Sequence, residues 1–323
     1  MNRFELVRAT SAAQAKELFA AKSGAVYKAG GVDVLDHLKE HLVEPPRLVD
    51  LKTIPGLDQI AVEGDGSVRI GALATLARVA AHEGVRKSHP ALARACGEAA
   101  SPQIRNVATL GGNVLQRPRC WYYRLESYKC IKKGGDTCYA IAGENRYHVI
   151  FGGGPSFPPH PSNAAVPLVA YGASFVLDGP KGPRTVPAAD FFVLPSKDPK
   201  RENTLQADEI LMEIRVPSAA GTRSTYQDVR ERAAFDWPLV SAAVALKSDG
   251  GVVREARVVL GAVAPVPWRS AKAEQALAGK PLDEAAAAAA ARAAIFGAVP
   301  LSENGYKVGL VQTLVRRTLM SIA

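Results

Sequence analysis

Two segments with paired glycines constrain this chain more than any other feature. The first is Val26-Tyr27-Lys28-Ala29-Gly30-Gly31-Val32-Asp33-Val34, and the second is Gln103-Ile104-Arg105-Asn106-Val107-Ala108-Thr109-Leu110-Gly111-Gly112-Asn113. In the first segment a β-type run breaks at the glycines and leads into an expected helix at 34–40. Because glycine has no Cβ, its backbone N–H can come close to a ligand. A helix that starts directly after such a turn offers unpaired N–H donors and the favourable end of its dipole to a phosphate group.

Neither segment matches a common phosphate-binding signature. The Gly-x-Gly-x-x-Gly pattern of dinucleotide-binding proteins and the Walker pattern are both missing. Taken alone, each glycine pair is also typical of a plain turn. The order and spacing of several motifs along the chain are more specific than either pair.

Together with Ile70-Gly71-Ala72 and Ser101-Pro102-Gln103-Ile104-Arg105-Asn106, the two segments resemble the FAD-binding (medium) subunits of molybdenum hydroxylases. This family includes xanthine dehydrogenases, carbon monoxide dehydrogenase and aldehyde oxidoreductases, and the resemblance extends over nearly the whole chain. It implies an α+β fold, in which a two-subdomain, vanillyl-alcohol-oxidase-like (PCMH-type) FAD-binding domain precedes a C-terminal domain of antiparallel sheet and helices.

The resemblance also implies which residues contact FAD. Backbone N–H groups of the first segment would wrap the pyrophosphate: Lys28, Ala29, Gly30, Gly31, Val32, Asp33 and Val34. The second subdomain would contribute Thr109, Gly111, Gly112 and Asn113. The run His160-Pro161-Ser162-Asn163 matches a family His-Pro-Ser-Asp motif whose acid contacts the flavin. Asn163 keeps a hydrogen-bonding group there but loses the charge. The alternative for Asn163 is a turn residue before a helix.

Two further positions are expected near the flavin ring. Asp228 stands where the family has a lysine close to the isoalloxazine. A cation there would stabilise reduced, anionic flavin and a carboxylate would not, which predicts a lower flavin potential or a replacement partner such as Arg230. Trp237, in a segment similar to the family's aromatic-Asp-aromatic run, is expected to pack near the flavin. A buried core tryptophan is the alternative.

Three of the four cysteines, Cys120, Cys130 and Cys138, fall within 19 residues. No Cys-x-x-Cys occurs, so the spacing alone is a weak metal signal, and three free thiols acting as small buried hydrophobes are an alternative. However, the loop is polar, and basic neighbours would lower thiolate pKa values and offset an anionic iron–sulfur cluster. These neighbours are Arg117, Arg119, Arg124, Lys129, Lys132 and Lys133.

The same loop resembles the branch formed by medium subunits of bacterial aldehyde oxidoreductases and hydroxybenzoyl-CoA reductase, where four cysteines hold an extra [4Fe–4S] cluster. Three cysteines match, and Ser156 stands near the expected fourth. The fourth ligand would then be Ser156, His160, His148 or water; a three-iron cluster or no cluster are the other options. We predict that a cluster is bound. Cys96, on the helix before the second glycine pair, is expected to serve packing.

A chain of 323 residues suggests two or three domains. Residues 1–60 read as a β-α-β-α-β subdomain. Residues 61–177 form a second subdomain with an irregular, cysteine-bearing insertion at 117–162, and residues 178–323 form the C-terminal domain. In this last domain we expect strands at 209–216, 224–229, 240–247 and 252–260, and helices at 271–278, 283–294 and 308–320.

Composition excludes several function classes. Four cysteines do not indicate a disulfide scaffold, and no run of 18 apolar residues indicates a membrane span. The net charge of +9 permits acidic partners, but the basic residues are dispersed and no nucleic-acid motif is present. The N-terminus lacks signal-peptide features, so we expect a cytoplasmic protein, with co-export on a partner's signal as the alternative.

The leading hypothesis is therefore an FAD-binding electron-transfer subunit. By resemblance, substrate chemistry takes place on a large molybdopterin-binding subunit, and a small subunit with two [2Fe–2S] clusters passes electrons to the FAD, which delivers them to an external acceptor. No catalytic base or nucleophile is required in this chain, and none is evident. The alternatives are a stand-alone FAD-dependent oxidase of the same superfamily and a non-enzymatic iron–sulfur or basic binding module.

Overall fold

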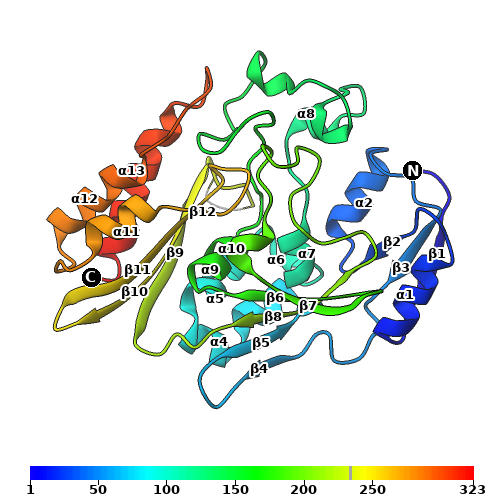
Figure 1. The fold of residues 1–323 in the computed structure, drawn as a ribbon, viewed down its shortest axis with the longest axis horizontal. Coiled ribbons are helices and arrows are strands. Elements are labelled where there is room, and N and C mark those ends of the chain that lie inside the picture. Colours follow the sequence, from blue (N-terminus) through cyan, green and yellow to red (C-terminus); the bar gives the residue numbers. More distant parts are fainter. Residues whose placement is uncertain (233–234) are drawn as a thin grey trace.

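The computed structural model describes residues 1–232 and 235–323. The N-terminal unit has the predicted β-α-β-α-β order (Figure 1). Its elements are β1 (Glu5–Arg8), α1 (Ala12–Ala20), β2 (Val26–Lys28), α2 (Val32–Lys39) and β3 (Arg47–Asp50). The strands form a parallel sheet in the order β1-β3-β2. Ser11 caps α1 as predicted, because its side chain accepts a hydrogen bond from the Gln14 N–H.

The second unit is built on a five-stranded antiparallel sheet in the order β4-β5-β8-β6-β7. The strands are β4 (Ile60–Val62), β5 (Val68–Gly71), β6 (Ser174–Gly179), β7 (Gly182–Pro187) and β8 (Ile210–Val216). The helices are α3 (Leu76–Ala81), α4 (Glu83–Ser88), α5 (Pro90–Glu98), α6 (Pro102–Arg105), α7 (Leu110–Leu115), α9 (Ala165–Ala170) and α10 (Ala188–Phe191). Residues 182–216, which the sequence suggests for the C-terminal domain, therefore belong to this sheet.

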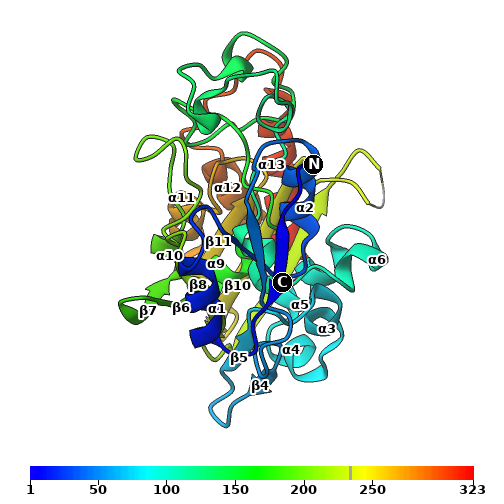
Figure 2. The ribbon, with the colours of Figure 1, turned by 90° about the vertical axis from the view of Figure 1, so that its right-hand side faces the viewer.

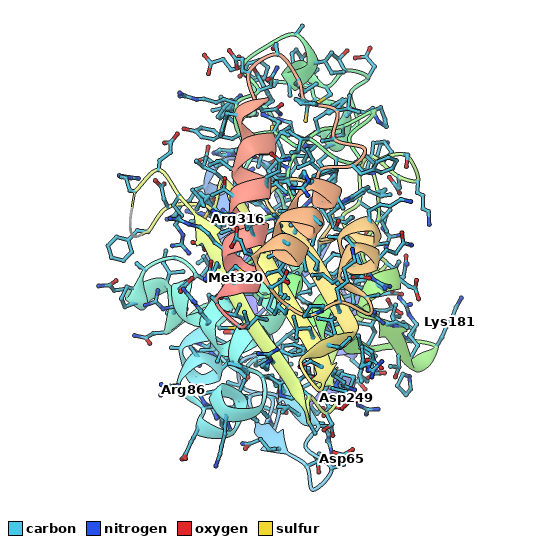
Figure 3. All side chains as sticks on the ribbon, turned by 90° about the vertical axis from the view of Figure 1, so that its left-hand side faces the viewer. Asp65, Arg86, Lys181, Asp249, Arg316 and Met320 are labelled. Carbon is cyan, nitrogen blue, oxygen red and sulfur yellow. The ribbon has the colours of Figure 1, made fainter. Side chains whose placement is uncertain are left out.

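The C-terminal unit is an antiparallel sheet in the order β12-β11-β10-β9, with three helices on one face (Figure 3). Its strands are β9 (Thr222–Val229), β10 (Val240–Asp249), β11 (Val252–Gly261) and β12 (Trp268–Arg269), and its helices are α11 (Ala271–Leu277), α12 (Glu284–Ala294) and α13 (Tyr306–Met320). The alanine run forms α12, as predicted, and buries its small side chains against α11 and α13. The opposite face contributes Tyr226 and Val259 to the core shared with α5 and α9.

The insertion lies at one end of the molecule, between α2 and the connection from α12 to α13 (Figures 1 and 2). It contains α8 (Trp121–Arg124) and two 3-10 turns, η1 (Ile131–Lys133) and η2 (Tyr139–Ile141). Asn145 ties it to the C-terminal unit, because its side chain donates to Ser302 Oγ and its backbone N–H donates to Glu303. Charged side chains tie its first part to α2, as described below.

The expectation that the insertion is a polar loop is wrong in one respect. Cys130 and Cys138 are buried, and Cys138 packs with Tyr122 and Ala140 in a small apolar cluster. Cys96 is fully buried in the main core, as its expected packing role requires. Within the described ranges, 1–232 and 235–323, no helix is long and apolar enough to cross a membrane.

A buried histidine links the helical layer to the end of β8. The His89 Nε2 lies 2.8 Å from the Pro217 carbonyl oxygen, and its ring packs edge-on against Tyr171. Burial lowers the pKa of His89, while the hydrogen bond to Pro217 acts in the opposite direction. The unfolded chain therefore binds this proton more tightly than the folded chain. As a result, the free energy of unfolding decreases as the pH falls below about 6.5, the unfolded-state pKa of histidine.

We predict that His89→Gln lowers the free energy of unfolding at pH 8 by roughly 1–3 kcal/mol, because a buried hydrogen bond is lost. The difference in free energy of unfolding between the variant and the wild type should be smaller at pH 5, because unfolding of the wild type is then favoured by protonation of His89. Urea unfolding at both pH values measures this. Thr318→Val, which removes a buried hydroxyl hydrogen bond without removing a titratable group, is the control and should lower the free energy of unfolding equally at both pH values. If His89→Gln lowered the free energy of unfolding equally at pH 8 and pH 5, this would contradict a lowered pKa for the buried His89.

Candidate functional site

A cavity of about 1000 Å³, the main cavity, lies where the three units meet. Both glycine-pair segments line it, together with Asn163 just before α9, residues in the connection from α10 to β8, and residues 235–237 in the approach to β10. Its lining includes Ala29, Gly30, Gly31, Val32, Asp33, Val34, Thr109, Gly111, Gly112, Asn113, Asn163 and Trp237. All of these are residues that the sequence assigns to FAD. Lys28 is not in the lining; its ammonium group pairs with Asp50 at 3.2 Å.

The first segment has the geometry of an anion-binding turn. Gly31 precedes α2 with φ of 88°, a left-handed conformation that glycine adopts without strain. No side chain caps this helix end, so the first-turn N–H groups have no partner within α2. A Cβ on Gly30 would lie 2.2 Å from the Val107 carbonyl oxygen. Glycine is therefore required for the first segment to pack against the second.

The second glycine pair contributes shape rather than free donors. The Gly111 N–H donates to the Ala72 carbonyl oxygen at 2.9 Å. The Gly112 N–H donates to Thr109 Oγ1 at 3.1 Å, which caps α7. These two N–H groups are therefore not free to bind a phosphate. A Cβ on Gly111 would lie 2.8 Å from the Ala72 Cβ, so glycine lets α7 pack closely against the segment after β5.

Asn113 and Asn163 both line the main cavity, and both are neighbours of Ser162. The Ser162 hydroxyl donates to Asn113 Oδ1 at 2.6 Å, which leaves the Asn113 amide nitrogen as a donor. Asn163 is 5% exposed and lies just before α9. Its two interpretations from sequence are thus compatible, because it precedes the helix and also lines the cavity.

Three arginines of the insertion, which the sequence associates with the thiols, bind carboxylates instead. Arg119 and Arg124 both pair with Asp33, at 2.9 and 2.8 Å, and both also contact Asp36 on α2. Arg117 pairs with Glu202 at 2.9 Å. Burial raises the pKa of Asp33, but Arg119, His37 and Arg124 outweigh it and hold this pKa below its usual value. The side chain of Asp33 therefore faces the insertion, and sequence reasoning gave it only a backbone role.

Trp237 lies at the cavity wall rather than in the core, with 46% of its side chain exposed. The Arg119 guanidinium lies 4.9 Å from the centre of its ring, a cation–π contact. This contact joins the insertion to the approach to β10. Of the two alternatives from sequence, the position beside the cavity is the observed one.

Asp228 does not line the main cavity, nor the second, smaller cavity described below. Its carboxylate pairs with Arg230 at 2.5 Å, and both side chains are less than 10% exposed. Arg230 also donates to the Glu98 carbonyl oxygen at 2.7 Å. The Asp228 carboxylate is therefore neutralised by Arg230, and neither residue lines the cavity that contains most of the other expected FAD contacts.

The cysteine loop does not present an assembled metal centre in the part of the chain that the structure describes. No group of three or more His, Cys, Asp or Glu side chains could hold a metal ion there. Cys120 Sγ lies 3.2 Å from His148 Nε2. Burial raises the pKa of Cys120 to about 12 and also raises the pKa of Cys138. The expectation of lowered thiolate pKa values is wrong for Cys120 and Cys138, because burial dominates their pKa values.

A second cavity of about 300 Å³ adjoins the first. The two share four lining residues, Arg119, Asn163, Asp236 and Trp237. The smaller cavity is enclosed by the insertion, the segment before α9 and the approach to β10, and its walls include Trp121, Tyr147, His148, His160 and Leu239. No pattern in the sequence predicts it, because its residues come from five separate segments: 119–121, 147–148, 159–163, 231–241 and Ala262.

Comparison with known proteins decides the family. Residues 2–219 match the FAD binding domain in molybdopterin dehydrogenase, and residues 224–322 match the CO dehydrogenase flavoprotein C-terminal domain. The chain belongs to the FAD-binding subunits of the molybdenum hydroxylase family. The predicted α+β fold, FAD-binding subunit function and oxidoreductase class are confirmed.

Relatives match along the full length. The aldehyde oxidoreductase FAD-binding subunit PaoB of Escherichia coli K12 is 35% identical over 325 residues, covering 100% of this chain and 98% of PaoB. The carbon monoxide dehydrogenase medium chain of Hydrogenophaga pseudoflava is 30% identical and covers 92% and 88%. A solved structure of carbon monoxide dehydrogenase from H. pseudoflava superposes with a TM-score of 0.78 at 30% identity, covering 99% of this chain and 97% of that one.

We predict that Gly30→Ala weakens FAD binding at least about tenfold, or ~1.4 kcal/mol, because the new methyl group would push the first segment away from the Val107 carbonyl. Titration of the deflavinated chain with FAD, followed by flavin fluorescence, measures this. Gly309→Ala is the matched control: a Cβ there meets nothing within 4 Å, and the site lies within α13. Unchanged FAD affinity in Gly30→Ala would show that the two segments do not form one binding site.

Proposed function

We propose that the main cavity holds FAD, with the pyrophosphate at the first glycine pair and the start of α2, and the isoalloxazine beside Asn163 and Trp237. The observation that carries this is the turn at Gly31, which leaves the first N–H groups of α2 without intrahelical partners at the cavity wall. The volume of the cavity and the fact that both glycine pairs line it support the same placement. When bound, FAD supplies the redox chemistry, and the chain supplies its position and electrostatic surroundings.

The chain's own charges support this orientation. The Asp33 and Asp36 carboxylates, which would repel a pyrophosphate, are each bound by Arg119 and Arg124. The Arg119 guanidinium also contacts the Trp237 ring. The insertion thus neutralises these two carboxylates, and the start of α2 can present its backbone donors to the phosphates.

We propose that the chain works in a complex with a large molybdopterin-binding subunit and a small subunit carrying two [2Fe–2S] clusters, in the cytoplasm or co-exported with a partner. Electrons from the small subunit would reach FAD here and pass to an external acceptor. The full-length similarity to PaoB and to the carbon monoxide dehydrogenase medium chain supports this. It also counts against a stand-alone oxidase, because the similarity to these subunits extends over both the N-terminal and the C-terminal parts of the chain.

We infer that the chain divides near residues 219–224, between β8 and β9, rather than at 177. β7 and β8 pair within the sheet of the second unit. The N-terminal FAD-binding part would then comprise the first two units, and the C-terminal domain would begin at β9.

An Asn163→Asp variant tests where the flavin ring lies. A carboxylate close to the isoalloxazine disfavours reduced, anionic flavin, so the two-electron potential should fall by roughly 30 mV or more, ~1.4 kcal/mol. Potentiometric titration at pH 8, where the new carboxyl is ionised, measures the shift. Gln206→Glu makes the same charge change at an exposed part of the cavity rim and should shift the potential much less. Equal shifts in both variants would contradict the placement.

We also propose that the insertion binds an iron–sulfur cluster through Cys120, Cys130 and Cys138, with Ser156 or a nearby group as the fourth ligand. The support is that Cys120 and Cys138 belong to one small cluster and that the Ser156 side chain hydrogen-bonds to Cys138. As arranged in this structure, burial raises the pKa of Cys120 and Cys138, so both thiols hold their protons near pH 7. Cluster assembly must therefore release these protons and rearrange the loop.

Iron and sulfide analysis after anaerobic reconstitution tests this proposal. We expect iron above background in the wild type, and more in Ser156→Cys, because a fourth thiolate completes the ligand set of a [4Fe–4S] cluster. Cys138→Ala should lose the iron and keep its FAD. Cys96→Ala, in the main core, is the control for a lost thiol. Background iron in both the wild type and Ser156→Cys would refute the cluster.

A further inference from the structure

We propose that the second cavity is the site where a small, uncharged, planar two-electron acceptor of the quinone class binds beside the flavin. This inference rests on the proposed function, because it requires FAD in the main cavity. The two cavities share Arg119, Asn163, Asp236 and Trp237. A flavin ring beside Asn163 and Trp237 would therefore form part of the boundary between them.

The size of the second cavity limits what it can accept. Its volume is about 300 Å³, against about 1000 Å³ for the cavity assigned to FAD. A nicotinamide dinucleotide is similar in size to FAD and does not fit in the smaller volume. A single substituted ring fits it.

The walls favour a flat, neutral ligand. Trp121, Tyr147 and Trp237 provide aromatic faces on which a planar ring can stack. The charged groups in the lining are Arg119, Glu231 and Asp236. Arg119 is already paired with Asp33 and Asp36. Asp236 is paired with Arg232. Among the described residues, the lining therefore offers no unpaired cation to a phosphate-bearing or otherwise anionic acceptor.

Two buried imidazoles supply hydrogen-bonding groups. His160 is 5% exposed, and its Nδ1 accepts a weak hydrogen bond from the Ser162 N–H at 3.4 Å. The proton of the neutral ring then lies on Nε2, which has no partner among the described residues. His148 is 1% exposed, and its Nδ1 also has no partner among them. A quinone carbonyl would accept from such a donor, and buried polar atoms without partners are uncommon unless a ligand or water completes them.

The reaction balances without another reagent. The two-electron-reduced flavin supplies two electrons and two protons in total, directly or through neighbouring groups and solvent. Each carbonyl of the quinone becomes a hydroxyl, the ring becomes aromatic and the flavin returns to its oxidised form. The chain's contribution is to hold the ring of the acceptor against the flavin and to exclude larger oxidants.

The test uses the full chain loaded with FAD and duroquinone, whose fully methylated ring resists addition by thiols such as Cys120. Two of the three tryptophans, Trp121 and Trp237, line the second cavity. Duroquinone should therefore quench the protein's fluorescence in a saturable manner in the oxidised state. In the reduced state, the rate of flavin reoxidation under anaerobic conditions should also saturate with duroquinone concentration.

Leu239→Trp is the decisive variant, because Leu239 lines the second cavity but not the first. Filling the cavity should reduce the ratio of the reoxidation rates with duroquinone and with ferricyanide by about tenfold or more, which corresponds to a tenfold loss of binding, and should abolish saturable quenching. Leu125→Trp, at an exposed position in neither lining, is the matched control and should retain both.

The outcomes separate the two proposals. If the wild-type chain binds no FAD, the proposed function fails and this inference fails with it. If FAD is bound with normal occupancy but the duroquinone rate rises linearly, or Leu239→Trp behaves as Leu125→Trp, the acceptor site is refuted and the FAD assignment stands. Saturation in the wild type and its loss only in Leu239→Trp would support the site.

Discussion

The close approach of Gly30 to the Val107 carbonyl oxygen is the constraint on which the rest of the site depends. It brings the start of α2, in the unit built on the parallel sheet, against the loop before α7, in the unit built on the five-stranded antiparallel sheet. A side chain of any size at Gly30 would separate these elements. Its Cβ would lie 2.2 Å from the Val107 carbonyl oxygen, which is far shorter than a van der Waals contact. The main cavity lies along this junction, so its shape follows from one contact between two backbones.

The insertion gives this junction its electrostatic balance. Asp33 and Asp36 add two negative charges to the end of α2 that would receive a pyrophosphate, and Arg119 and Arg124 neutralise them. These side chains are partly buried, so their pairing is less screened by solvent than at an open surface. Arg119 also contacts Trp237, and so the insertion, α2 and the approach to β10 share one residue. A substitution that moves Arg119 in the insertion is therefore expected to alter the walls of both cavities, because Arg119 and Trp237 line both.

Much of the fold could be read from local patterns. The β-α-β-α-β order, the Ser11 cap and the alanine helix all depend on interactions within a few residues, and each was predicted. The end of the second unit was not, because β8 joins that sheet by pairing with β5, a strand about 140 residues earlier. The thiol chemistry was also misjudged. Basic residues close to the cysteines in sequence turn toward carboxylates on α2, and burial then dominates the thiol pKa values.

The sequence by itself determined the family and the two glycine-pair segments of the cavity lining, because glycine pairs, caps and short motifs act through the backbone within their own segments. Tertiary structure alone decided three things: that Asp228 pairs with Arg230 away from the cavities, that Gly111 and Gly112 use their N–H groups internally, and that a second cavity adjoins the first. Each depends on distances between segments far apart in the chain. Such distances are set by how sheets and helices pack, and residue order does not record them.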